Sequence, residues 1–141
     1  MKNSLMHTSI RLFVSLLLLT PVLALAAASI EDISARTASA LIQENLSNPD
    51  FIILDIRTPR EFEAGHIDGA RNMDVYAQSF AQAFKSLDRE KTYLIYCRSG
   101  NRSRQLMGAV EKMRFKKVFH IRSGLVDWVG QGYKLVNPQP E

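Results

Sequence analysis

Cysteine is nearly absent from this 141-residue sequence, which contains only Cys97. A single cysteine cannot close an intramolecular disulfide, so its thiol is either an inert part of the core or a reactive group. Histidine is also rare and occurs only at positions 7, 66 and 120. One cysteine and three scattered histidines form no metal-binding pattern, and no motif for an organic cofactor is present. We therefore expect neither a metal nor a cofactor.

The sequence also lacks a polybasic tract. It has 18 Lys and Arg against 14 Asp and Glu, and two of the basic residues, Lys2 and Arg11, lie within the first 28 positions. Without those two, the remaining chain has 16 basic and 14 acidic residues, a net charge near +2. Such a balance gives no support for nucleic acid or a membrane surface as a partner.

Charge is missing entirely from residues 12–28, a leucine- and alanine-rich stretch that follows Lys2 and Arg11. A basic start, a short apolar stretch and a small-residue end, here at 24–26 or 26–28, are typical of a secretory signal peptide. An uncleaved anchor is the alternative, but a membrane span needs about 20 apolar residues and Pro21 interrupts this one. We predict that residues 1–28 are removed and that the mature protein is periplasmic, without stable membrane association.

The rest of the chain alternates between two kinds of pattern. Continuous apolar runs of strand length occupy residues 51–56, 92–97 and 116–121, and a further short strand is expected within 65–73. Helices are expected at 37–45, from Pro59 to Gly65, and at 76–87, 104–113 and 124–131. This alternation predicts one α/β domain over residues 29–137 with a central, mostly parallel sheet, followed by a disordered tail at 138–141.

The stretch after Cys97 is unusual, because three arginines follow the thiol within seven residues, in CRSGNRSR. Cys97 ends a predicted strand, and ligands of open α/β sheets gather at the carboxyl ends of strands. Gly100 permits a curled loop whose N–H groups point inward, and the helix that opens near Ser103 adds positive potential. With Arg98 and Arg102, these features predict a lowered Cys97 pKa and an anionic substrate. The alternative is an inert core thiol.

Three segments carry a resemblance to a known family. LDIRTPREFEAGHIDGARNM, YLIYCRSGNRS and IRSGLVDW together resemble the rhodanese-like domains, in the order in which that family has its corresponding motifs, over residues 51–128. The chain is similar to the small, single-domain, exported thiosulfate sulfurtransferases. One departure is Ser123-Gly124, where a Gly-Gly pair is usual. The resemblance implies a parallel sheet flanked by helices on both faces, with Cys97 as the nucleophile.

The resemblance also implies a two-step reaction through a Cys97 persulfide. The sulfur donor would be a small anion such as thiosulfate, and the acceptor a thiol, a protein thiol or cyanide. The expected substrate-binding residues are those of the loop: Arg98, Ser99, Gly100, Asn101, Arg102 and Ser103. Related phosphatases and arsenate reductases have the longer loop C-x5-R, whereas this loop is C-x4-R. Phosphatase or arsenate reductase activity is therefore a distant second to sulfur transfer. A persulfide carrier or binding module with low turnover is a further alternative.

Several other polar residues have simpler explanations. Asp55 and Arg57 are expected to pair with each other and to support the loop, rather than to act chemically. Glu61 is explained by helix capping, and His66 by a hydrogen bond within a loop. His120 ends a strand without an evident partner. Three aromatic residues are expected to pack in the core: Trp128, Phe80 and Phe84. Arg104 is expected to point to solvent.

Overall fold

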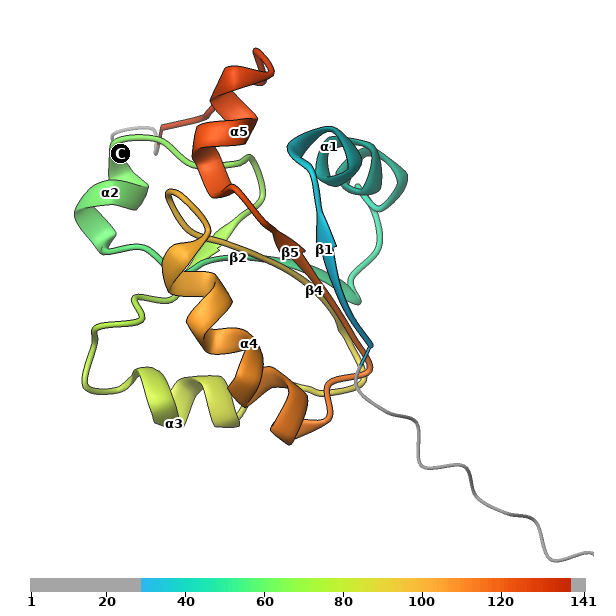
Figure 1. Ribbon diagram of the computed structural model, residues 1–141, viewed down its shortest axis with the longest axis vertical. Coiled ribbons are helices and arrows are strands. Elements are labelled where there is room, and N and C mark those ends of the chain that lie inside the picture. The colour runs from blue at the N-terminus through green and yellow to red at the C-terminus, as the bar shows by residue number, and fades with distance from the viewer. Residues whose placement is uncertain (1–28, 138–141) are drawn as a thin grey trace, which may run out of the picture.

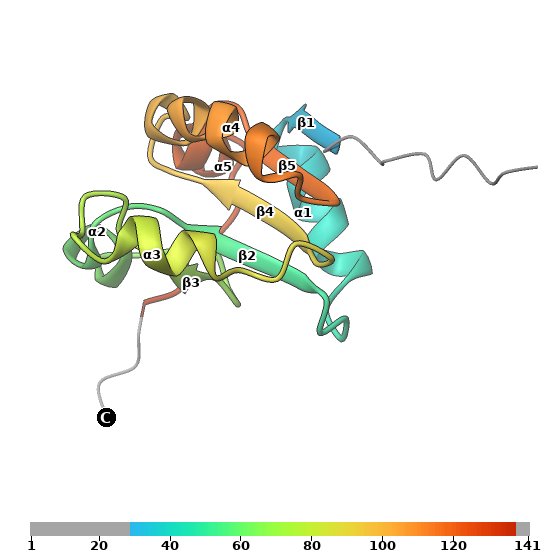
Figure 2. The same cartoon turned by 90° about the horizontal axis from the view of Figure 1, so that it is seen from below.

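The computed structural model describes residues 29–137, which form one five-stranded sheet. The strands are β1 (Ser29–Ile33), β2 (Phe51–Asp55), β3 (Arg71–Asn72), β4 (Thr92–Tyr96) and β5 (Lys117–Ile121). Their order is β1-β5-β4-β2-β3 and every pairing is parallel. Figure 2 shows this order from β1 at the top to β3 at the bottom. The predicted α/β fold with a parallel sheet is confirmed.

Helices cover both faces of the sheet, as expected (Figure 1). Helices α1 (Ala35–Glu44) and α5 (Gly124–Gly130) pack on one face, where Ile53, Leu94 and Ile121 point. Helices α3 (Phe80–Lys85) and α4 (Asn101–Met113) pack on the other. The central strands β2, β4 and β5 are therefore buried on both sides, which explains why they are read in the sequence as continuous apolar runs.

Short helix α2 (Pro59–Glu63) follows β2 directly and buries none of its residues. The helix is stabilised by the hydrogen bonds of its first turn instead. The Thr58 side chain accepts a hydrogen bond from the N–H of Glu61, and the Glu61 carboxylate accepts one from the N–H of Thr58. This is the capping box expected from the sequence, with Pro59 at the first helical position.

The structure corrects several predicted boundaries. Strand β1 was not predicted, because it is an edge strand whose only buried residue is Ile33, so it has little apolar pattern. Strand β4 ends at Tyr96, one residue before Cys97, and α4 begins at Asn101 rather than near Ser103. Helix α3 is shorter than the predicted 76–87. Phe84, Trp128 and, in part, Phe80 pack in the core as expected.

The predicted signal peptide at 1–28 and the predicted tail at 138–141 lie outside the described residues. Within residues 29–137, no helix has the length and apolar character needed to cross a membrane.

Candidate active site

Cys97 lies immediately after β4, at the carboxyl edge of the sheet where the chain turns into α4. Only residues 98–100 separate it from the first residue of the helix. The residue is completely buried, whereas Arg98 and Ser99 are exposed. The thiol therefore lies at the base of a very short loop, with the N-terminal turn of α4 directly beside it.

The sulfur of Cys97 accepts two hydrogen bonds from this turn. The backbone N–H of Gly100 lies 3.2 Å from Sγ, and the Ser103 hydroxyl lies 3.4 Å from it. Burial raises the pKa of the thiol, but the Ser103 hydroxyl and the N–H groups of Ser103, Ser99 and Gly100 outweigh that effect. The pKa of Cys97 is therefore lowered, as the sequence predicted, and hydrogen bonds to the thiolate are the reason.

The predicted contribution of the arginines to this lowered pKa is smaller than that of the hydrogen bonds, although the pKa of Arg102 is raised in part by the charge of Cys97, so these two groups do interact. The charges of Arg98 and Arg102 are not among the leading causes of the shift at Cys97. The inward-pointing N–H groups that were also predicted do donate to the sulfur, and the Ser103 hydroxyl joins them.

Two glycines allow the chain to pass close to the cysteine. Gly100 has φ of 84°, and a Cβ atom there would overlap the carbonyl group of Arg122, which precedes α5. Gly124 has φ of 57°, and a Cβ atom would overlap the backbone of Cys97 and Arg98. Ser123 has φ of −105°, which any residue adopts, so the departure from Gly-Gly leaves this packing intact.

The first turn of α5 also forms backbone hydrogen bonds to the cysteine loop. The N–H of Leu125 donates to the carbonyl of Cys97 and the N–H of Val126 donates to that of Arg98, each at 3.0 Å. These bonds use backbone carbonyls of the loop, so they leave its N–H groups directed toward the sulfur. The sequence motif at the start of α5 therefore contributes to the site by fixing the loop.

Arg102 is not available as an open anion-binding group. Its guanidinium makes a bidentate ion pair with Glu61, with N–O distances of 2.8 and 2.7 Å. The hydrogen bond from Arg102 is the main reason that the pKa of Glu61 falls to about 2. Glu61 thus has the capping role expected for it and also links α2 to α4, which the sequence did not indicate because 41 residues separate the partners.

Asp55 and Arg57 form a buried ion pair, as the sequence predicted. Arg57 Nη2 lies 2.6 Å from the Asp55 carboxylate, and the same nitrogen donates to the carbonyl of Gly65 at 2.7 Å. Neither side chain has a hydrogen bond to residues 97–103 within the described structure. The pair holds the turn after α2 directly, and Arg57 also lies over the ring of Tyr96, at 6.0 Å, the residue that precedes Cys97. Any support of the cysteine loop by this pair is therefore indirect.

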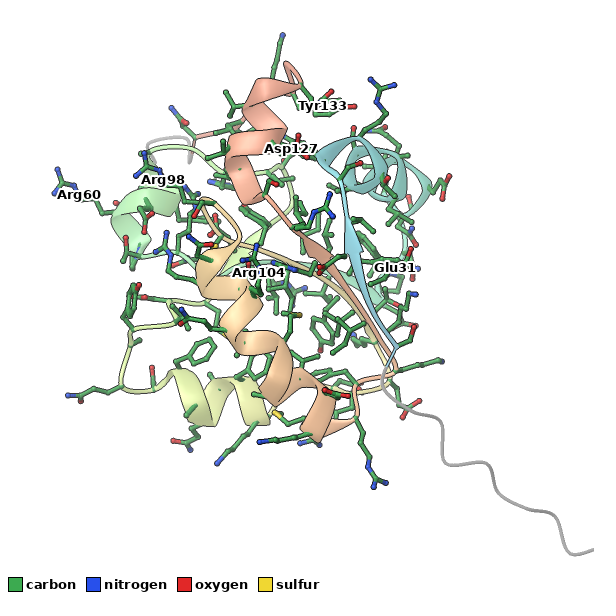
Figure 3. All side chains as sticks on the ribbon, viewed as in Figure 1. Glu31, Arg60, Arg98, Arg104, Asp127 and Tyr133 are labelled. Atoms are coloured by element: carbon green, nitrogen blue, oxygen red, sulfur yellow. The ribbon has the colours of Figure 1, made fainter. Side chains whose placement is uncertain are left out.

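An open cleft lies beside the loop, between α2 and α5. It is lined by Arg57, Glu61, Ala64, Arg98, Leu125, Val126, Val129 and Gly130. Figure 3 shows Arg98 at this place, next to α2 and the start of α5. The exposed Asn101, at the start of α4, does not line it. A second cleft, along α1 and the chain after α5, contains none of residues 97–103. A smaller pocket beside α4 is lined by Val75, Tyr76, Arg102, Gln105 and Leu106, so it also reaches the loop. The cleft beside Arg98 is the larger of these two openings at the cysteine loop.

The two described histidines differ in their surroundings. His66 bonds through Nδ1 to the carbonyl of Phe62 and stacks on that ring, so it is the hydrogen-bonded loop residue that was expected. His120 is wholly buried and does have partners, which corrects the expectation of none. Its Nε2 lies 2.7 Å from Ser103 Oγ and its Nδ1 lies 2.7 Å from Asp32. The sequence did not indicate these partners, because Ser103 and Asp32 lie 17 and 88 positions away from His120. In addition, Asp32 belongs to β1, a strand that was not predicted.

Within residues 29–137, no cluster of three or more His, Cys, Asp or Glu side chains could hold a metal ion. The arrangement around Cys97 offers a buried nucleophile with a ring of hydrogen-bond donors. Such a site suits covalent chemistry on the sulfur.

Comparison with known proteins finds relatives that resemble this chain in sequence and in fold. A curated sulfurtransferase of Allochromatium vinosum is 28% identical over 102 residues, covering 72% of this chain and 94% of that protein. The probable adenylyltransferase/sulfurtransferase MoeZ of Mycobacterium tuberculosis is 32% identical over 79 residues, but the match covers 56% of this chain and only 20% of MoeZ. A rhodanese-related protein of Thermoplasma volcanium superposes with a TM-score of 0.60 at 27% identity, covering 75% and 97% of the two chains.

The family model for the rhodanese-like domain matches residues 38–131, which include β2, β4, the Cys97 loop and α5. The relatives described above that carry the name sulfurtransferase come from the separate comparison with curated proteins. With the parallel sheet and the cysteine loop described above, this match establishes that the chain belongs to the rhodanese-like domain family.

Proposed function

We propose that the protein is a sulfurtransferase that moves a sulfane sulfur from thiosulfate, or a similar small anion, through a persulfide on Cys97. The observation that carries the proposal is the set of donors aimed at Cys97 Sγ, which are the N–H of Gly100 and the hydroxyl of Ser103. They lower the pKa of the thiol and so favour the thiolate that must attack. The same donors would hold the terminal sulfur of the persulfide.

The reaction proceeds in two displacements. The Cys97 thiolate attacks the outer sulfur of thiosulfate, the S–S bond of the donor breaks, and sulfite leaves with the bonding electron pair. The enzyme then carries a Cys97 persulfide anion. A nucleophilic acceptor, which is a thiolate or cyanide, attacks the terminal sulfur and releases the Cys97 thiolate. Protons and electrons balance over the cycle without any cofactor.

Arg98 is the cationic group best placed for the donor anion. It is exposed, lines the open cleft and, among residues 29–137, has no ion-pair partner. Arg102 is held by Glu61, so its role is to fix the first turn of α4 rather than to capture substrate. The exposed Val126 and Val129 form an apolar wall of the same cleft. An acceptor thiol on a small molecule or on a protein surface can approach along that wall.

The test is mass spectrometry of the protein after exposure to thiosulfate. Because Cys97 is the only cysteine, one added sulfur atom (about 32 Da) would report its persulfide. We expect the adduct in the wild type, its loss on addition of cyanide, and no adduct in Cys97→Ser, which keeps a side chain of similar size. Failure of the wild type to gain sulfur under conditions in which Cys97 can still be alkylated would contradict the proposal.

A pair of variants tests the donor-binding role of Arg98. Arg98→Gln should raise KM for thiosulfate roughly five- to tenfold, as expected for loss of one partly exposed charge contact. Arg104→Gln removes the same charge from the first turn of α4, where the side chain is exposed (Figure 3), and serves as the control. Equal effects of the two variants would mean that general charge, and not Arg98, attracts the anion.

The alternatives give different results in the same experiments. A persulfide carrier would gain the sulfur but release little sulfite over repeated turnovers. A phosphatase or arsenate reductase would act on aryl phosphate or arsenate without any sulfur adduct. We further propose that the protein acts in the periplasm as a single exported domain. The signal-peptide pattern of residues 1–28 supports this proposal.

A further inference from the structure

A continuous line of hydrogen-bonded side chains leads away from Cys97 on the side opposite the cleft. Ser103 Oγ on α4 lies 3.4 Å from Cys97 Sγ and 2.7 Å from Nε2 of His120 on β5. His120 Nδ1 lies 2.7 Å from Asp32 Oδ1 on β1. Three separate elements thus contribute one side chain each to a chain that ends at the sulfur.

The direction of these hydrogen bonds depends on the proton carried by His120. A carboxylate only accepts, so the Nδ1–H of His120 donates to Asp32. If Nε2 carries no proton, the Ser103 hydroxyl donates to it and has no proton left for the sulfur. If Nε2 carries a proton, it donates to Ser103 Oγ, and the hydroxyl proton of Ser103 turns to another acceptor. Gly100 O at 3.1 Å and Cys97 Sγ are the two choices, and a thiolate is the stronger acceptor.

We propose that Asp32, His120 and Ser103 form a proton relay that takes the thiol proton of Cys97 and keeps it on His120 while the sulfur is a thiolate. The S–H proton passes to Ser103 Oγ as the hydroxyl proton of Ser103 passes to His120 Nε2. The products are a thiolate that accepts from Ser103 and an imidazolium that donates to both Ser103 and Asp32. No proton or electron is gained or lost in the step.

The burial of Cys97 explains why its proton needs a route through other side chains. Cys97 and His120 are both 0% exposed, whereas the side chain of Asp32 is 50% exposed. The N–H groups that surround the sulfur donate and cannot accept a proton. In the described part of the chain, the hydrogen bonds from the sulfur lead through Ser103 to one basic nitrogen, and from there to a carboxylate in contact with water.

No other charged group on the elements around His120 takes the place of Asp32 in the Asp32–His120 pair. On α4, Arg102 is neutralised by Glu61, and Arg104 is exposed. On β1 and β5, Glu31 pairs with Lys117 at 2.8 Å. Arg98, in the loop after β4, lies on the cleft side. Asp32 is therefore the carboxylate that balances the positive charge of a His120 imidazolium.

Asp32, His120 and Ser103 are positioning residues, since they act on the substrate only through Cys97. Their role in sulfur transfer rests on the proposed function, but their effect on the thiolate can be measured without any sulfur donor. The rate of Cys97 alkylation by iodoacetamide across a range of pH reports the thiolate directly. A pH profile separates the relay from a packing role, which would alter thermal stability without moving the midpoint.

We expect His120→Gln to move the midpoint of alkylation upward by about one pH unit, since one hydrogen bond to a charged group is worth about that much. At pH values below the midpoint the rate should fall about tenfold. Asp32→Asn, which keeps an acceptor but removes the charge, should move the midpoint in the same direction. Glu31→Gln is the matched control, because it removes a carboxylate from the neighbouring position of β1 that contacts Lys117 and not His120. It should leave the midpoint unchanged.

A second measurement covers the case in which a buried substitution prevents folding. Nitrogen-15 NMR of the His120 ring in the wild type and in Cys97→Ser reports the same coupling from the other end. The imidazolium should persist to higher pH in the wild type, because the thiolate stabilises it through Ser103. If His120 titrates identically in both proteins, or if Asp32→Asn leaves the alkylation midpoint where it was, the relay is refuted. If the variants shift the midpoint as expected but the wild type transfers no sulfur, the relay stands and the proposed function is refuted.

Discussion

Gly100 and Gly108 both lie in or next to α4, yet the structure predicts opposite effects for their replacement by alanine. Gly100 precedes the helix with φ of 84°, and a Cβ atom there would overlap the carbonyl of Arg122. Gly108 is an exposed residue in the middle of the helix, and apart from the adjacent backbone of its own helix a Cβ atom there would have no atom within 4 Å. The pair thus compares the same chemical change at two positions of one element.

The magnitudes follow from these surroundings. Alanine at a left-handed position costs about 1–2 kcal/mol, and displacing the backbone that it would overlap costs about 1–3 kcal/mol more. Gly100→Ala should therefore lower the free energy of unfolding by roughly 2–5 kcal/mol. The shift of the loop should also weaken the N–H bond to Cys97 Sγ, now 3.2 Å, and so reduce thiolate reactivity about tenfold. Gly108→Ala should stabilise the helix by about 0.5–1 kcal/mol.

Urea unfolding of the two variants measures the stabilities, and iodoacetamide alkylation at fixed pH measures the thiolate. The expected result is a large loss of both in Gly100→Ala and a small gain of stability, with unchanged alkylation, in Gly108→Ala. If Gly100→Ala unfolds at the same urea concentration as the wild type and alkylates at the same rate, then the close approach of the loop to Arg122 does not constrain the site.

Three further predictions concern the pair on α2 and α4, the loop length and the N-terminus. Because the pKa of Glu61 is lowered to about 2, its ion pair with Arg102 stabilises the fold above the ordinary carboxyl pKa and is lost as pH falls. Glu61→Gln should therefore be about 1–2 kcal/mol less stable at neutral pH, and the difference should vanish between about pH 5 and 2 in unfolding experiments. Insertion of one glycine between Gly100 and Asn101 should weaken thiosulfate:cyanide transfer and raise hydrolysis of a small aryl phosphate; a wild type that already hydrolyses the phosphate faster than it transfers sulfur would contradict the loop-length argument. N-terminal sequencing of the native protein should find a start at residues 27–29, whereas a start at Met1 would favour a membrane anchor.

The sequence alone predicted the parts of the protein that depend on local patterns. Apolar runs of strand length gave β2, β4 and β5, because strands buried on both faces need apolar residues at every position. Thr58, Pro59 and Glu61 gave the start of α2, since capping acts within four residues. The single cysteine, Cys97, and the glycine three residues after it, Gly100, predicted the position of the cysteine loop and the lowered pKa of the Cys97 thiol.

The tertiary structure alone decided which distant side chains meet there. Ion pairing of Glu61 with Arg102 joins positions 41 residues apart, and the His120 bond to Asp32 spans 88. The latter depends on β1, whose exposed edge position leaves almost no apolar pattern to recognise. Hydrogen bonds between remote residues depend on strand order and register, which a local pattern does not encode. The sequence therefore located the cysteine loop, while only the fold revealed the side chains that are hydrogen-bonded in line with its sulfur.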